Sequence, residues 1–137
     1  LYYTSYSLYL LNGSTVQWDG KLFKNYDLPI GVTHGFPMLD RFKKLSIKLD
    51  NSALSDESNL KRLLFGRVSG AIVRTEMGDK LLTHRSDFTT KIYKHPIPVS
   101  KTPHFLMFSF SFYKENPILA NNIWESILTI RELEDSK

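Results

Sequence analysis

Four consecutive residues are the best candidates for a ligand-binding site: Thr33, His34, Gly35 and Phe36. They follow an apolar run from Leu28 to Val32 and precede Pro37, which suits the first position of a helix because it lacks an N–H group. A strand that leads through a glycine turn into a helix leaves backbone N–H groups unpaired. These groups carry partial positive charge and can hold a carboxylate or phosphate. We therefore expect a binding site at the N-terminus of a helix from Pro37 to about Lys44.

Arg74 and Glu76 form the second candidate site, because they follow the apolar run from Val68 to Val73. Such a run predicts a buried strand, and open α/β sheets bind their ligands beyond the carboxyl ends of the strands. We therefore expect Arg74 and Glu76 to lie beside the same ligand as the first group. The alternative is a solvent-exposed arginine that binds no ligand.

The sequence offers little support for catalysis or for a metal site. Residues 31–35, Gly-Val-Thr-His-Gly, superficially match a nucleophile elbow, but threonine takes the place of serine and no clear acid–histidine pair follows. The histidines are too dispersed for a metal signature such as His-Glu-x-x-His: His34, His84, His95 and His104. The absence of cysteine excludes disulfides, thiolate zinc sites and thiol catalysis. We therefore predict a protein that is not an enzyme and that uses no metal or cofactor.

The composition is that of an ordinary globular protein with a modest basic charge. Of the 137 residues, 42% are hydrophobic and 23% are charged, and the net charge is +4. No apolar run approaches the roughly 18 residues needed to span a bilayer. The basic residues are scattered, so we expect no nucleic acid as a partner. A small basic nucleic-acid-binding domain remains an alternative, since the aromatic run from Phe105 to Phe112 follows Lys101 and His104 and could stack on bases.

Apolar periodicity and turn residues predict the elements that would position these residues. Strands are expected over six ranges: Tyr2–Leu11, Leu28–Val32, Leu45–Leu49, Val68–Val73, Thr90–Tyr93 and Phe105–Phe112. Helices are expected over four ranges: Pro37–Lys44, Leu60–Phe65, Met77–His84 with Thr75 as its cap, and Pro117–Leu133. A turn at Asn12-Gly13 would connect the first strand to a returning strand, from Thr15 to Trp18, in a hairpin. Residues Asp50–Ser58 would form a polar loop. The alternation predicts an α/β fold with a largely parallel sheet flanked by helices.

Three segments, in this order, resemble those of the amino-acid-type periplasmic solute-binding proteins of bacterial import systems. The first is Leu-Pro-Ile-Gly-Val at residues 28–32, with the glycine turn and helix that follow. The second is residues 59–72, in which a leucine-bearing helix leads to Gly-Arg and then to an apolar strand. The third is the strand from Phe105 to Phe112, ahead of a C-terminal helix. The resemblance covers nearly the whole chain and implies that the chain corresponds to the later part of a family member.

The resemblance implies two α/β lobes, with the second inserted into the first through two hinge crossings. Residues 1–104 would be the second lobe with its outgoing hinge strand, and residues 105–137 the return strand and C-terminal helix of the first lobe. Tyr9 and Phe108 would lie near the hinge. The implied function is non-catalytic binding of a small solute in the cleft between the lobes, outside the cytoplasm, as the receptor component of an import system with a membrane permease. The alternative is a solute-sensing module of a membrane signalling protein, and an exposed C-terminal segment would allow a dimer.

Departures from the family pattern indicate the kind of ligand. Phe36 stands where the family often has threonine after the glycine, and Ser69 replaces the usual aspartate beside Gly-Arg. Arg74 stands where an acidic residue commonly receives the ammonium group of the ligand. A pair of charges about 4 Å apart is worth about 4 kcal/mol at an effective dielectric constant near 20, so arginine turns attraction for an ammonium into repulsion of similar size. We therefore expect an anionic or aromatic ligand, or a degenerate site, rather than an ordinary α-amino acid.

Overall fold

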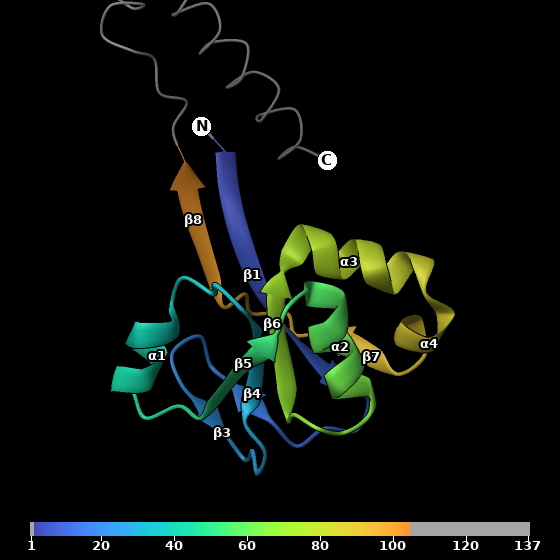
Figure 1. Cartoon of the computed structure of the whole chain (residues 1–137), viewed down its shortest axis with the longest axis horizontal. Helices are drawn as coiled ribbons and strands as arrows, with labels where there is room; N and C mark the ends of the chain where they lie inside the picture. The colour runs from blue at the N-terminus through green and yellow to red at the C-terminus, as the bar shows by residue number, and fades with distance from the viewer. Residues whose placement is uncertain (1, 105–137) are drawn as a thin grey trace, which may run out of the picture. The chain divides into compact units, whose positions relative to one another are not determined.

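A mixed β-sheet forms the centre of the described part of the chain, residues 2–104 of a computed structural model. Within these residues the strand order is β5-β4-β6-β1-β7, and β8 also pairs with β1 (Figure 1). The strands are β1 (Tyr2–Leu11), β4 (Ile30–Thr33), β5 (Leu49–Ala53), β6 (Gly70–Arg74), β7 (Ile92–Lys94) and β8 (Ser100–His104). The core strands β5, β4 and β6 run parallel, and β1 pairs antiparallel with β6 and β7. The predicted α/β fold with a parallel core is therefore confirmed.

The chain divides into two compact units. Ser5–Lys101 form one unit, and Leu1–Thr4 together with Thr102–Lys137 form the other. Every site discussed below lies within the unit from Ser5 to Lys101. The strand expected at Phe105–Phe112, the hinge residue Phe108 and the C-terminal helix lie outside the described residues, and the division into two lobes stays a prediction.

Each face of the sheet has its own apolar core, because side chains along a strand point alternately to opposite faces. Leu8, Leu10 and Ile72 belong to one core, and Tyr9, Ala71 and Val73 to the other. Helices α2 (Asp56–Leu64), α3 (Thr75–His84) and α4 (Ser86–Thr89) cover the Tyr9 face. Helix α1 (Leu39–Lys44) and the hairpin of β2 (Gln17–Trp18) and β3 (Phe23–Lys24) cover the Leu8 face. Figure 1 shows α1 on the opposite side of the strands from α2, α3 and α4.

The hairpin predicted across Asn12-Gly13 is wrong. The two neighbours of β1 are already β6 and β7, so the returning chain has no free edge of β1 to pair with over residues 6–11. A hairpin forms instead between β2 and β3. In the turn that joins them, the Asp19 carboxylate accepts hydrogen bonds from the backbone N–H groups of Lys21 and Leu22, each at 2.8 Å. These hydrogen bonds also lower the pKa of Asp19 below its usual range.

Two predicted element boundaries are also wrong. The strand expected at Leu45–Leu49 begins only at Leu49, and it continues through the supposed polar loop to Ala53 because it pairs in parallel with β4. Thr75 is the first residue of α3 rather than its cap, and its hydroxyl is hydrogen-bonded to Ser5 at 2.8 Å and to Ser7 at 2.6 Å. Thr75 thus ties the start of α3 to β1.

Asn59 of α2 links the helix to two parallel strands. Its side-chain Nδ2 donates to the carbonyl oxygen of Gly31 at 3.2 Å and to that of Ile72 at 3.1 Å, and the residue is fully buried. The Asn59 side chain fits only because Gly31 has no Cβ, since a Cβ there would lie 2.4 Å from Asn59 Oδ1. Gly31 therefore sets the distance between α2 and the sheet.

Replacing Gly31 with alanine should lower the free energy of unfolding by about 1–2 kcal/mol, because the Asn59 side chain must move to make room. Chemical denaturation would measure the loss. Gly13→Ala is the control for space alone, since no atom lies within 4 Å of a Cβ there, although its φ of +83° adds backbone strain. An unchanged stability of the Gly31 variant would contradict this packing.

Tyr9 is the largest fully buried side chain on its face of the sheet. Its hydroxyl donates to Asp79 Oδ1 at 2.9 Å and lies 3.3 Å from the carbonyl oxygen of Thr75. Burial, and then the Asp79 carboxylate, raise the pKa of Tyr9 far above its ordinary value. The phenol therefore stays protonated in the folded protein at pH values where it ionises in the unfolded chain.

This difference predicts an alkaline loss of stability. The contribution of Tyr9 is fully present below about pH 10 and falls as the pH rises above that value, by up to about 1.4 kcal/mol per pH unit. The midpoint of thermal unfolding of the wild-type protein should therefore fall more between pH 9 and pH 11 than that of Tyr9→Phe. Tyr93→Phe, which changes a tyrosine that is 37% exposed, is the control and should follow the wild type. Equal alkaline losses in all three proteins would contradict the assignment.

Candidate functional site

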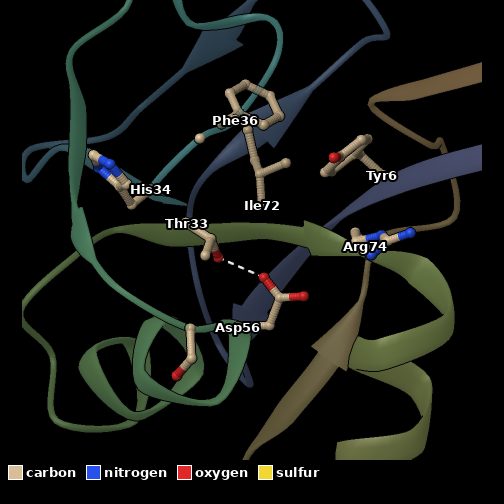
Figure 2. Close-up of a pocket in the computed structure, with 9 residues that line it drawn as sticks. Tyr6, Thr33, His34, Phe36, Asp56, Ile72 and Arg74 are labelled. Atoms are coloured by element: carbon tan, nitrogen blue, oxygen red, sulfur yellow. Dashed lines mark hydrogen bonds between the residues drawn. The ribbon is translucent and has the colours of Figure 1, made fainter.

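A pocket of about 350 Å³ lies where the parallel strands end. Its lining residues are Tyr6, Thr33, His34, Gly35, Phe36, Ser55, Asp56, Ile72 and Arg74 (Figure 2). Thr33 is the last residue of β4, Arg74 is the last residue of β6, and Asp56 follows the end of β5 by three residues. Because β4, β5 and β6 run parallel, their carboxyl ends meet at one edge of the sheet, where α/β proteins commonly bind ligands.

The structure brings five of the six predicted site residues together at this pocket. Thr33, His34, Gly35, Phe36 and Arg74 line it. Glu76 does not: it is exposed on α3 and absent from the lining. Tyr9, the predicted hinge residue, is fully buried beneath α3 within the unit that carries the pocket.

The helix after the glycine turn starts later than expected, and two amides of the preceding loop are hydrogen-bonded within the protein. Helix α1 begins at Leu39, so Pro37 is not helical. The N–H of His34 donates to the carbonyl oxygen of Ala53 at 2.7 Å, and the N–H of Phe36 donates to that of Thr33 at 3.0 Å. Gly35, with a φ of +88°, permits this tight turn. These two amides hold the loop in shape and are not available to a ligand, whereas ligand binding by the other amides at the start of α1 stays a prediction.

The side chain of Asp56 is the main feature that the sequence reasoning missed. Its Oδ1 accepts a hydrogen bond of 2.5 Å from the hydroxyl of Thr33, a residue 23 positions earlier in the chain (Figure 2). Ser55 caps α2 by accepting a hydrogen bond from the Ser58 N–H at 3.1 Å, which places Asp56 at the first helical position. The sequence pattern Ser-Asp-Glu-Ser signals a helix start, but only the parallel pairing of β4 and β5 shows that this start lies beside Thr33.

Arg74 supplies the positive charge of the pocket. Its side chain is exposed, and the structure gives it no hydrogen bond or ion pair with any other residue in the described part of the chain. Asp56 is half-buried and forms no ion pair with Arg74, although both line the same pocket. The site thus holds one guanidinium whose five N–H donors are available to a ligand.

Aromatic side chains form the apolar wall. The rings of Tyr6 and Phe36 meet edge to face, with their centroids 5.3 Å apart. Phe36 is only 7% exposed and also packs against Phe42 of α1, with centroids 5.7 Å apart. Ile72 of β6 is fully buried and completes the floor. Phe36 is therefore both a core residue and a pocket residue, and it fixes the position of the loop.

The described residues contain neither a candidate metal cluster nor a candidate membrane span. No group of three or more His, Asp or Glu side chains there could hold a metal ion. In the same part of the chain, no helix is both long enough and apolar enough to cross a membrane.

Comparison with known proteins supports the fold through structure rather than sequence. No family model matches the chain, and no curated protein matches it. The chain is similar in structure to the ligand-binding core of GluR0 from Nostoc punctiforme, which was solved in complex with L-glutamate. The TM-score is 0.62 at 13% sequence identity, and the match covers 98% of this chain and 61% of the other.

This likeness shows the fold alone. The described unit has a periplasmic-binding-protein-like fold, with parallel core strands flanked by helices. The chain spans about three fifths of the length of the protein it matches. Membership in the amino-acid-type family stays a prediction, and so do the solute, the partners and the cellular location.

Proposed function

We propose that the chain binds a small anionic solute with an aromatic group, without catalysis, in the pocket between the β4–α1 loop and the start of α2. One observation carries this proposal above the others: an arginine whose side chain has no partner among the described residues shares a pocket with the rings of Tyr6 and Phe36. A carboxylate on the guanidinium and a ring against the aromatic wall would use both features.

The Arg74 guanidinium would bind the carboxylate of the solute. Arginine and carboxylate can form two parallel hydrogen bonds, and this geometry is stronger and more selective than a single contact. A hydrogen bond to a charged group contributes about 1.5–3 kcal/mol. Because Arg74 has no partner among the described residues, binding breaks no existing ion pair there.

Asp56 restricts which anions fit. Its carboxylate already accepts the Thr33 hydroxyl and would repel a second negative charge on the solute, which favours a monoanion. Carboxylate oxygens have several acceptor positions, so Asp56 could also accept a hydrogen bond from a hydroxyl of the solute. An aromatic hydroxy acid would therefore satisfy Arg74, Asp56 and the aromatic wall together.

The same contacts favour a binding role over an enzymatic one. Thr33, the only hydroxyl residue of the predicted cluster, donates to a carboxylate rather than to a histidine. His34 is exposed on the loop, and no acid–histidine pair orients Thr33 within residues 2–104. An acyl-transfer mechanism of the Ser-His-acid type would need such a pair.

We propose that the whole receptor lies outside the cytoplasm, and that a second lobe closes over this pocket and also contacts the ligand. The receptor would serve a membrane permease or, alternatively, a membrane signalling protein. If the whole site bound with a micromolar dissociation constant, about −8 kcal/mol, half of that energy corresponds to only about millimolar binding. We therefore expect millimolar affinity from these 137 residues alone.

A matched pair of ligands tests the proposal. L-phenyllactate and L-phenylalanine share a ring and a carboxylate and differ only in a hydroxyl against an ammonium group. Titrations followed by NMR should give a tighter dissociation constant for L-phenyllactate, in the millimolar range, because Arg74 repels the ammonium. Tighter binding of L-phenylalanine would contradict the proposed selectivity and identify Asp56 as an acceptor for an ammonium group. Micromolar binding of either ligand would contradict a shared site.

A further inference from the structure

A second, larger groove of about 710 Å³ lies over the Leu8 face of the sheet, between the β2–β3 turn and the C-terminal end of α1. Five residues line it: Lys21, Leu22, Arg41, Lys44 and Leu45. We call it the basic groove. It shares no residue with the pocket at the strand ends, so what it binds does not depend on the proposed solute.

Among the described residues, the basic groove is lined by three cations and by no acidic residue. The side chains of Lys21, Arg41 and Lys44 form no hydrogen bond or ion pair with other residues in the described part of the chain. The nearest acid in the turn, Asp19, directs its carboxylate to the backbone N–H groups of Lys21 and Leu22 instead. Three cations around one groove thus remain available to an acidic partner, which would also displace their counterions.

Two leucines give the groove an apolar component. Leu22 and Leu45 are each 44% exposed, and the backbone of each residue is hydrogen-bonded. The carbonyl oxygen of Leu22 accepts a hydrogen bond from the Asp19 N–H at 3.4 Å, and the Leu45 N–H lies 3.2 Å from the carbonyl oxygen of Phe42. A single exposed leucine is ordinary, but two leucines beside one groove give an apolar side chain of a partner a surface to pack against.

We propose that the basic groove docks an acidic amphipathic segment of another protein, with carboxylates on the three cations and an apolar side chain between Leu22 and Leu45. Charge complementarity supports this occupant, and the concave shape favours a chain segment over the flat surface of a bilayer. Nucleic acid fits less well, because the aromatic residues of the hairpin stack on each other and are buried: Trp18 is 5% exposed and Phe23 is 7% exposed. No ring at the groove is free to stack on a base.

A labelled peptide of three Glu-Leu repeats provides the probe, with fluorescence anisotropy at low ionic strength as the measurement. The variant K21E/R41E/K44E should bind it at least tenfold more weakly than the wild type. The control variant R67E/K80E/K91E changes the net charge equally on exposed residues outside the groove and should lose less than twofold. The variant L22S/L45S should weaken the Glu-Leu peptide severalfold and leave a Glu-Ser peptide unchanged.

Equal losses in the two charge variants would overturn the proposal, because attraction by net charge alone would then explain binding. Stronger binding to phosphatidylglycerol vesicles, lost in K21E/R41E/K44E, would also overturn it in favour of a membrane surface. If a charge variant fails to fold by circular dichroism, a chemical-shift map of the wild type with the peptide replaces it. Shifts at residues 21–22 and 41–45 support the proposal, and shifts elsewhere or none overturn it.

Discussion

Alanine in place of Gly78 should destabilise the protein by about 3 kcal/mol, the largest effect we expect from a single methyl group here. A Cβ at this position of α3 would lie 2.3 Å from the hydroxyl oxygen of Tyr9 and 2.4 Å from its Cζ. The ring cannot move aside, because Tyr9 is fully buried between the sheet and α3 and its hydroxyl is bound to Asp79. In an unconstrained helix the same change would stabilise by about 0.5–1 kcal/mol, so the expected sign is opposite to helix propensity.

A double-mutant cycle separates this clash from other effects of the substitution. In a Tyr9→Ala background the ring is gone, so Gly78→Ala should become neutral or slightly stabilising. Urea denaturation of the four proteins gives the coupling free energy. A loss of about 3 kcal/mol in both backgrounds would show that Tyr9 does not limit the approach of α3 to the sheet.

Reversal of charge at Arg74 should have the largest effect on ligand binding. Arg74→Glu removes the proposed partner of the ligand carboxylate and places a second carboxylate beside Asp56. The loss of charged hydrogen bonds alone, about 1.5–3 kcal/mol, corresponds to roughly a 10- to 100-fold weaker dissociation constant for L-phenyllactate. Since wild-type binding is expected to be millimolar, an NMR titration should detect no saturation with the variant.

Arg67→Glu is the matched control, because it makes the same change at an exposed residue that does not line the pocket. It should bind L-phenyllactate within twofold of the wild type. Both variants should unfold at similar temperatures, since the Arg74 side chain makes no hydrogen bond or ion pair in the described residues that its loss would break. Retained binding by Arg74→Glu would remove Arg74 from the site.

Local sequence signals predicted the parts of the fold that local interactions determine. The apolar run before Thr33 predicted β4 to within two residues at its start and one at its end, and the predicted end of α2 at Phe65 is one residue from its observed end at Leu64. β6 was also predicted from its apolar run, with a shift of one or two residues. The parallel order could be inferred because strands and helices alternate along the chain.

Features that depend on distant contacts were missed. β5 has the sequence Leu-Asp-Asn-Ser-Ala, which has no strand pattern, and it forms a strand because β4 lies beside it. Helix α1 starts after Pro37 because Phe36 is buried against Tyr6 and Phe42, which holds the chain in a turn. Asp56 joins the site for the same reason, since its partner Thr33 is adjacent only in the folded sheet.

The most direct test of the central claim is a ¹H–¹⁵N chemical-shift map of the 137-residue protein titrated with L-phenyllactate to 20 mM. A solute held by Arg74 and the aromatic wall should give the largest shifts at residues 33–36, Asp56 and Arg74, with little change at residues 21–22 and 41–45. Shifts that avoid the strand ends, or no shifts at 20 mM, would contradict a solute-binding pocket at this edge of the sheet.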